Sequence, residues 1–334
     1  MLKTATITKQ ATKEKPYRIL ADRRKMTRGQ WLELRSNYLG GSDVSAVIPG
    51  GNRWRTPFQV FAEKKGLVKR QPASEACYFG ILFEDLLIKE FTKRSGYKTF
   101  PVPFVLQSVQ TPWLIADIDS AIDFENEKFG ILEIKTTNTF SGAEEWNNGE
   151  VGNIPVEYYF QCQTYMHVTG LDLTYIACLI GGQKFVYQPI QRDQDTIDFI
   201  IKVTGAWYED FLRNVPPPVE SNDAAFLSQL YPKAKELKQV ELPETANDIL
   251  TNYEKANKDL ALAKAAKEEC EAKLKAMMAD AEIAVIGSRR ISWKNVSTTR
   301  LDSKKVKSLL TEDQLNECSN TTVSRKFTVS APKK

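Results

Sequence analysis

The spacing of apolar residues divides the chain into helical and extended stretches. Trp31 and Leu34 are spaced for one face of a helix, and the T-x-x-Q pattern at 27–30 is a capping box that starts one. After residue 96, apolar and polar positions alternate as on a half-buried strand. Helices are expected to begin at 27, 42 and 57 and to span 80–93, 156–168 and 195–212, with strands over 104–107, 113–124, 130–137, 173–179 and 184–189. This order predicts an α/β fold in which helices flank a mixed central sheet.

Glycines and small polar residues predict where the first two helices meet. Gly40 and Gly41 are expected to end the first helix, and Ser42 and Asp43 can cap the second.

The chain is expected to divide into four parts. Residues 1–26 lack apolar periodicity and are predicted to form a flexible arm, followed by an α/β domain over 27–214. Prolines at 216, 217 and 218 mark a break, and 215–244 has the composition of a linker. Residues 245–334 are expected to form a helical and basic C-terminal module. Within it we expect a long helix over 247–282, a hairpin over 283–296, a short helix over 304–310 and a strand over 323–329.

The long helix expected in this module has a heptad pattern. Apolar residues from Ile249 to Ala281 recur alternately four and three residues apart, with Lys267 as a polar member. This pattern is typical of coiled-coil packing. A single amphipathic helix that lies on the domain fits the same pattern.

Charge is unevenly distributed along the sequence. The 334-residue chain has a net charge of +4, but residues 283–334 carry 11 Lys and Arg against 4 Asp and Glu. That segment therefore has a net charge of +7 and the rest of the chain −3. A basic segment on an acidic body favours contact with a polyanion, although a solvated, lysine-rich surface has the same composition.

Residue usage excludes several kinds of chemistry. The five cysteines contain no C-x-x-C pair and His167 is the single histidine, so zinc ribbons, iron–sulfur clusters and histidine-rich metal sites are not expected. No run approaches the ~18 apolar residues of a membrane span, and the N-terminus has no secretory signal. The chemistry therefore falls to carboxylates, in a protein expected in the cytoplasm.

Acidic residues and a lysine lie on the two strands expected on either side of the polar turn at 125–130. Asp117 and Asp119 would share one face of the first strand, and Glu133 and Lys135 one face of the second. If the strands are neighbours, Asp119, Glu133 and Lys135 meet. Two carboxylates can hold a divalent cation, and a lysine beside it can stabilise negative charge, which suits phosphodiester hydrolysis. A structural salt bridge between Glu133 and Lys135 fits the same spacing.

Short motifs recur in a fixed order over 31–212. They are Leu34-Arg35-Ser36, Gly40-Gly41-Ser42-Asp43, Gly80 with Glu84, Ala116 to Asp119, Leu132 to Thr136, and Tyr158 to Met166. In this order the chain resembles the YqaJ-type viral recombinases, relatives of lambda exonuclease in the PD-(D/E)xK nuclease superfamily. The resemblance implies a restriction-endonuclease-like core. It also implies a magnesium-dependent, two-metal exonuclease that degrades double-stranded DNA ends 5′ to 3′, with Mn²⁺ as a substitute for Mg²⁺.

The resemblance further implies a biological setting. It implies phage or prophage recombination in the cytoplasm of a bacterial host, a single-strand annealing protein as partner and no membrane. Some relatives form trimeric rings, and a homo-oligomer is therefore compatible with the sequence.

The resemblance also assigns roles to residues. The metal donors are Asp119, Glu133, the carbonyl of Ile134 and Glu84; Lys135 is the catalytic lysine; Gln161 and Tyr158 line the active site; Gln163 and Asp117 are expected to be structural.

Arginines and a serine near the first helices suggest a phosphate pocket. Arg35 presents a fork that matches phosphate oxygens, and Ser42 lies at an expected helix N-terminus, where backbone N–H groups favour anions. Arg53 and Arg55 follow in a loop and add positive charge. We expect this group, with Tyr158 nearby, to bind DNA and its terminal 5′-phosphate.

Two other functions fit the same sequence. One is an endonuclease of the same superfamily, and the other is a DNA-binding recombination protein with a degenerate nuclease core. The intact Asp119, Glu133 and Lys135 argue against the degenerate core. A pocket for a terminal phosphate argues against the endonuclease, because an internal cut has no terminal phosphate to bind.

Overall fold

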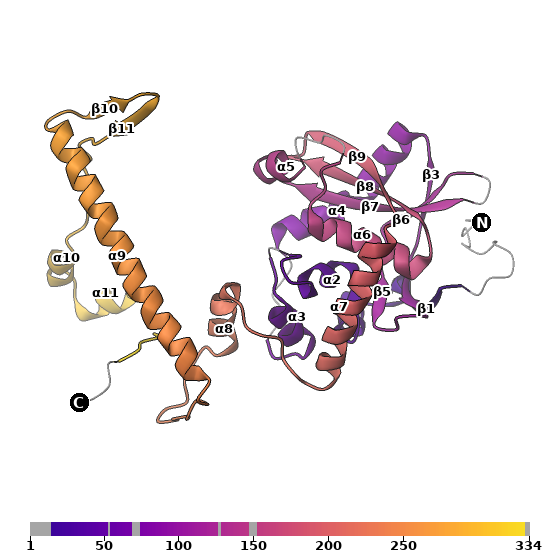
Figure 1. Cartoon of the computed structure of the whole chain (residues 1–334), viewed down its shortest axis with the longest axis horizontal. Coiled ribbons are helices and arrows are strands. Elements are labelled where there is room, and N and C mark those ends of the chain that lie inside the picture. The colour runs from indigo at the N-terminus through magenta and orange to yellow at the C-terminus, as the bar shows by residue number, and fades with distance from the viewer. Residues whose placement is uncertain (1–14, 53, 69–73, 126–127, 147–151, 331–334) are drawn as a thin grey trace. The chain divides into compact units, whose positions relative to one another are not determined.

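The chain forms two compact units, residues 1–231 and 232–334 (Figure 1). The computed structural model describes residues 15–52, 54–68, 74–125, 128–146 and 152–330. Among these residues, none of the helices is long and apolar enough to cross a membrane. The helices of the first unit are α1 (Arg28–Ser36), α2 (Gly41–Val47), α3 (Pro57–Lys64), α4 (Glu75–Ser95), α5 (Thr139–Glu145), α6 (Val156–Thr169), α7 (Gln194–Leu212) and α8 (Ala224–Leu230), with short 3₁₀ turns η1 (Arg23–Lys25) and η3 (Ser221–Asp223).

The core of the first unit is a five-stranded mixed sheet. The sequence predicted a mixed sheet, but its edge strand Lys98–Pro101 was not predicted. Its strand order is β3 (Lys98–Pro101), β6 (Ser120–Asp123), β7 (Phe129–Thr137), β8 (Leu173–Ile180) and β9 (Lys184–Gln191). Strands β6 and β7 are antiparallel, with Ser120 opposite Leu132, whereas β7 and β8 are parallel. The parallel pair is connected through α5 and α6, as a parallel crossover requires.

Helices cover both faces of this sheet (Figure 1). Leu132 and Ile134 of β7 pack in a cluster with Phe91 of α4. Ile131 lies instead in the cluster that contains Met166 of α6. Side chains alternate along a strand, so Glu133 and Lys135 lie on the same face as Ile131, which is the face covered by α6.

A second sheet of four strands was not predicted. Its order is β1 (Tyr17–Asp22), β4 (Phe104–Ser108), β5 (Leu114–Ala116) and β2 (Leu39–Gly40). Strand β1 pairs with β4, so the expected flexible arm is wrong for residues 15–26, while residues 1–14 lie outside the described part of the chain. Arg23, which follows β1, donates to the carbonyl of Val102 and pairs with Asp117.

The strand expected over 113–124 is two strands in different sheets. Strand β5 ends at Ala116, and β6 begins at Ser120 in the five-stranded sheet. The prediction that Asp117 and Asp119 share a strand face is therefore wrong, because the chain passes from one sheet to the other between them. Alternation of polar and apolar residues continued through the crossing and hid it.

The junction between α1 and α2 differs from the prediction in its cap. Thr27 and Gln30 form the expected capping box of α1. The N-cap of α2 is Gly40, so Ser42 and Asp43 lie inside the first turn. The Asp43 carboxylate accepts a hydrogen bond from the Gly40 N–H at 3.3 Å.

The first unit extends beyond the expected boundary at 214. Asp223 is fully buried and accepts hydrogen bonds from Thr56 at 2.5 Å and Gln59 at 2.9 Å. Phe226 of α8 meets Phe58 of α3 edge to face. Much of the predicted linker, up to Tyr231, is therefore packed on α3.

The second unit, orange to yellow in Figure 1, is built around one long helix. Its elements are α9 (Ala246–Met278), a hairpin of β10 (Ile283–Ile286) and β11 (Arg289–Ser292), α10 (Ser303–Leu309) and α11 (Glu312–Glu317). The long helix and the hairpin were predicted. Residues 323–329 form no strand, and α11 was not predicted.

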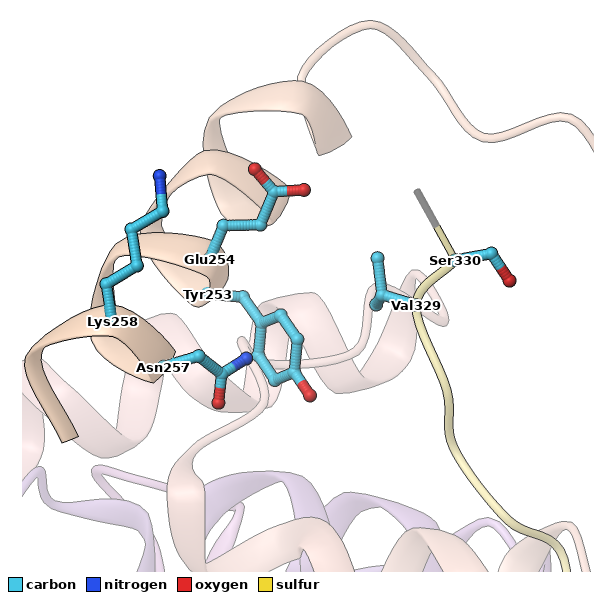
Figure 2. A pocket seen from close by; sticks show the side chains of 6 residues that line it. All are labelled: Tyr253, Glu254, Asn257, Lys258, Val329 and Ser330. Carbon is cyan, nitrogen blue, oxygen red and sulfur yellow. The ribbon is translucent and has the colours of Figure 1, made fainter. Parts of the chain in front are cut away.

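Within the second unit, most of the heptad seam of α9 is left uncovered. Ile249, Leu260 and Met277 are 71%, 68% and 82% exposed, respectively. Near the start of the helix, Phe327 packs edge to face on Tyr253. A hollow of about 320 Å³ lies beside this contact, and Figure 2 shows Tyr253 and Asn257 of α9 opposite Val329 across it.

Candidate active site

Asp119, Glu133 and Lys135 meet where β6 and β7 pair. The Lys135 ammonium forms an ion pair with Oε1 of Glu133. The Ile134 N–H donates to Oδ2 of Asp119 at 2.7 Å. The structure therefore brings these three side chains together, as expected from adjacent strands. The salt bridge considered as an alternative is part of the same cluster.

Gln161 of α6 orients the buried carboxylate. Its amide donates to Oε1 of Glu133 at 2.5 Å and to the Tyr165 hydroxyl at 3.0 Å. The Tyr165 hydroxyl donates in turn to the carbonyl of Asp117. Glu133 is only 2% exposed, and its second oxygen, Oε2, has no hydrogen-bond partner.

The cluster shifts the protonation of its members. Burial and the charge of Asp119 raise the pKa of Glu133 to about 8. Burial also raises the pKa of Asp119. Burial alone would lower the pKa of Lys135, but the carboxylates of Glu133 and Asp119 raise it above its usual value. Without a further cation, this site holds more negative charge than its one lysine compensates.

The donor set fits one divalent cation. Oε2 of Glu133 is a buried oxygen without a partner, which an ion would satisfy, and the Asp119 carboxylate and the Ile134 carbonyl are hard oxygen donors of the kind Mg²⁺ prefers. In the described part of the chain, no three His, Cys, Asp or Glu side chains form a group that could hold a metal ion. The structure thus does not assemble the expected three-carboxylate set with Glu84, although Mg²⁺ commonly keeps waters beside one or two carboxylates.

The charge of this site affects the pKa of Glu84 on α4. Burial, and next the charge of Asp119, raise the pKa of Glu84 to about 7. A carboxyl group whose pKa is raised on folding contributes stability below its unfolded pKa, and this contribution is lost as the pH rises through the folded value.

Glu84→Gln should therefore reduce the pH dependence of stability of the metal-free protein. Between about pH 5 and pH 8.5 the wild type should lose more melting temperature than the variant, because only the wild type must ionise a half-buried carboxyl group. Thermal unfolding followed by circular dichroism measures this. Glu75→Gln, an exposed position in the first turn of the same helix, is the control. Parallel curves for the wild type and Glu84→Gln would contradict the prediction.

A second polar cluster forms around Asp43 at the start of α2. The Arg55 guanidinium contacts Oδ1 of Asp43 at 2.8 Å, and Lys64 contacts Oδ2 at 3.0 Å. Arg35 is farther from this carboxylate, at 3.4 Å, and donates to the Ser42 hydroxyl at 3.0 Å. Arg35, Ser42 and Arg55 thus converge, as expected for a phosphate pocket, whereas Arg53 lies outside the described residues.

Asp43 holds the pocket together and leaves positive charge to spare. Burial alone would raise the pKa of Asp43, but Lys64, Arg55 and Arg35 hold it well below its usual value. Lys64 also donates to the carbonyl of Arg35, in the last turn of α1, and to that of Tyr38, which follows the helix. Asp43 therefore contacts three cations, of which Arg55 also pairs with Glu63 at 3.2 Å, and the one farthest from Asp43 is Arg35.

Trp31 connects the pocket to the crossing between the sheets. Its indole N–H donates to Asp117 at 2.8 Å, and the Arg35 guanidinium lies over its ring at 4.8 Å. Asp117 also pairs with Arg23 at 2.8 Å. Asp117 therefore anchors α1 and η1 beside the site, a structural arrangement consistent with its expected role.

Gly41 brings the pocket and the carboxylate cluster into contact. A Cβ at this position would lie 2.7 Å from Cε1 of Tyr165 and 2.8 Å from Cγ of Gln161. Only a glycine lets α2 approach α6 this closely. The α2 backbone at Gly41 therefore packs directly against Gln161, the residue that orients Glu133.

Gly41→Ala should lower the rate of catalysis without unfolding the protein. The added methyl group must displace Gln161 or Tyr165, so the hydrogen bond to Glu133 is lost or lengthened. We expect about a 10-fold loss of kcat, on the scale of one net hydrogen bond to a charged group. Gly29→Ala is the control, because a Cβ there meets nothing closer than 3.9 Å. Wild-type kcat in Gly41→Ala would show that this contact does not position Gln161.

Several contributors carried no signal in the sequence. Lys64 is nearly buried at the centre of the pocket, yet its position in a charged run resembles a solvated helix face. Tyr165 lay within a recognised motif without an assigned role. Gln163 is structural as expected, since it bonds to the backbone of Gln191 and Asp193. Tyr158 lies by Lys135, whose ammonium is 5.0 Å from its ring centre.

An acid immediately before β6, a Glu-x-Lys pair on β7 and a supporting glutamine on α6 form the arrangement that the sequence led us to expect of a PD-(D/E)xK nuclease. Residues 30–172 match the family model of the YqaJ-like viral recombinase domain. The chain is 35% identical over 295 residues to the uncharacterized protein YqaJ of Bacillus subtilis (strain 168), covering 86% of this chain and 90% of that protein. The chain therefore belongs to the YqaJ-like viral recombinase family.

Two solved structures are similar to part of the chain. The alkaline exonuclease LHK-Exo from Laribacter hongkongensis is 18% identical, with a TM-score of 0.46 over 56% of this chain and 94% of that chain. A phage-related exonuclease from Haemophilus somnus 129PT is 14% identical, with a TM-score of 0.39 over 53% of this chain and 96% of that chain.

Proposed function

We propose that the protein is a metal-dependent exonuclease that degrades double-stranded DNA from its ends, 5′ to 3′, and leaves single strands for recombination. The observation that carries this proposal is the pairing of a carboxylate cluster with a separate cationic pocket, joined at Gly41. A pocket for a phosphate has a purpose at a DNA end, where a terminal phosphate exists.

Each residue has a distinct part in this reaction. Asp119, Glu133 and the Ile134 carbonyl would hold a divalent cation, Mg²⁺ or Mn²⁺, which supplies Lewis-acid stabilisation of charge on the phosphate when bound. Lys135 contacts the scissile phosphate and stabilises its developing negative charge. Gln161 keeps the Glu133 carboxylate turned toward the site. The donors described provide for one ion, and a second ion, as in a two-metal mechanism, would depend on Glu84.

Arg35, Ser42 and Arg55 would hold the 5′-phosphate of the strand being degraded. Asp43 and Lys64 position these groups without contacting DNA. A guanidinium held at 3.4 Å from its carboxylate can turn to a dianionic phosphate at small cost, because Lys64 and Arg55 continue to compensate Asp43.

Digestion of matched DNA substrates tests the proposal. Linear duplex with a 5′-phosphate should be degraded faster than duplex with a 5′-hydroxyl, and a covalently closed circle should stay intact. Cutting of the closed circle would favour the endonuclease. Binding of all three without cutting, at any divalent metal concentration, would favour a DNA-binding protein with an inactive core.

The second unit is proposed to hold DNA or to dock a recombination partner such as an annealing protein. Its last 52 residues carry a net charge of +7. Removal of residues 232–334 should therefore weaken duplex binding and make it less dependent on salt, because fewer phosphates are neutralised. The cut belongs after Tyr231 because α8 covers α3 of the first unit.

Fluorescence anisotropy over a range of salt concentrations measures this effect. The truncated protein should keep cleavage, since every residue of the proposed site precedes the cut. An unchanged salt slope would leave the second unit with the docking role, which pull-down of the annealing protein would test.

A further inference from the structure

Trp54 places an exposed aromatic ring one side chain away from Lys135. It lies in the loop between α2 and α3, and 55% of its surface is exposed. Its ring centre is 6.1 Å from that of Tyr158, and the Tyr158 ring faces the Lys135 ammonium at 5.0 Å. Trp146 follows on at 6.0 Å from Tyr158 but is only 1% exposed. Of these three rings, Trp54 is the one that presents a broad surface to solvent.

The loop that carries Trp54 is held in place by hydrogen bonds. Oδ1 of Asn52 accepts from the backbone N–H groups of Trp54 at 2.8 Å and Arg55 at 3.0 Å. The Asn52 amide donates to Ser45 of α2 at 2.9 Å. The next side chain, Arg55, is fixed on Asp43. The indole is therefore displayed from an anchored backbone, which lowers the entropy lost when a ligand packs on it.

Trp54 neighbours a residue of each proposed phosphate contact. Its neighbour in sequence, Arg55, belongs to the pocket for the 5′-phosphate. Its neighbour in space, Tyr158, contacts the lysine assigned to the scissile phosphate. A terminal nucleotide whose 5′-phosphate lies at Arg55 and whose 3′-phosphodiester lies at Lys135 would have its base close to the Trp54 ring.

We propose that Trp54 is a stacking platform for the base of the 5′-terminal nucleotide. This inference rests on the proposed exonuclease function and names a base contact for it. Every base has a flat π face, so stacking on an indole accepts all four bases. An enzyme that removes successive nucleotides needs such a sequence-neutral contact. By contrast, Arg35, Ser42 and Arg55 of the proposed pocket would bind phosphate oxygens and not the base.

A cleavage experiment tests the contact with Trp54→Ala and Trp54→Phe. The substrates are two 5′-phosphorylated duplexes, one with a normal first nucleotide and one with an abasic first nucleotide. Trp54→Ala should lower kcat/KM on the normal duplex about 10-fold, the scale of one stacked base. It should cause no further loss on the abasic duplex, because the stacking partner is already absent. Trp54→Phe should retain most of the activity. Phe199→Ala, which removes an exposed ring of α7 outside the proposed site, should leave activity unchanged.

A binding experiment separates this inference from the exonuclease function itself. In a Glu133→Gln background, which does not cleave, a duplex with 2-aminopurine as its first base should lose fluorescence on binding. Adding Trp54→Ala should restore the fluorescence. If the protein cleaves no DNA end but quenching depends on Trp54, the exonuclease proposal fails and the stacking contact stands.

Three results would overturn the stacking proposal. One is equal activity of Trp54→Ala and the wild type on the normal duplex. Another is an equal loss on normal and abasic duplexes, which would mean that the substitution disturbs Arg55 instead. The third is a difference in molecular mass between the wild type and Trp54→Ala, measured by light scattering. This difference would place Trp54 at a contact with a second copy of the chain.

Discussion

Glu133→Gln is expected to abolish DNA cleavage while leaving the fold intact. The substitution removes one negative charge and keeps the shape of the side chain, so packing between β7 and α6 is preserved. The buried oxygen that now has no partner, Oε2, becomes an amide that cannot serve as an anionic ligand. Loss of this oxygen removes a ligand of the proposed cation site. The charge stabilisation that the cation would supply is then lost as well.

The measurement is release of label from end-labelled duplex with saturating Mg²⁺, alongside isothermal calorimetry of Mg²⁺ binding. Lys135→Ala should keep cation binding and lose about 10²–10³-fold in rate, the scale of one transition-state stabiliser. Asp123→Asn, at the far end of β6, controls for general effects on the sheet. Near-normal cleavage by Glu133→Gln would mean that the active site has been assigned to the wrong carboxylate.

Arg35→Ala is expected to impair digestion of 5′-phosphorylated duplex about 10- to 100-fold, the scale of hydrogen bonds to a charged group. Activity on 5′-hydroxyl ends should change far less, because these ends give the guanidinium no dianion to bind. The pocket should survive the change, since Asp43 keeps Lys64 and Arg55 as partners. The expected signature is therefore a loss of preference for the phosphorylated end.

The two substrates must be compared in the same assay, with melting temperature measured for each variant. Arg213→Ala removes an exposed arginine that pairs with Asp210 and is the matched control. An equal loss on both ends would identify Arg35 as a general backbone contact, or as a support for Trp31 through their stacking.

Strands β7, β8 and β9 of the central sheet were predictable because their patterns are local. The Ile-Leu-Glu-Ile-Lys run of β7 has apolar residues on both sides of Glu133, which is typical of a buried strand. Its pairing with the strand that follows Asp119 was the basis for predicting that Asp119 and Glu133 meet. The crossing at 117–119 was not predictable, because a chain that changes sheets keeps the same alternation. Strand β1 was missed since only six residues form it and its partner β4 is more than 80 positions away.

The candidate site was predictable in its charges and in Gln161, but not in the contacts that position them. Acids and arginines stand out in a sequence, whereas the contact of Gly41 with Gln161 and Tyr165 is a property of two helices that meet in space. That the other elements of the second unit leave most of the α9 seam uncovered was also unforeseen. A heptad pattern indicates that one face of a helix can be buried, but it does not identify the surface that buries this face.

The contact at Gly41 fixes a length as well as a position. It rigidly sets the separation between the place where a strand end would be anchored and the place where the strand would be cut. Under the proposed function, this separation works as a ruler. The size of the released fragment would then be a property of the protein's backbone, constant from one cycle to the next whatever bases the strand contains.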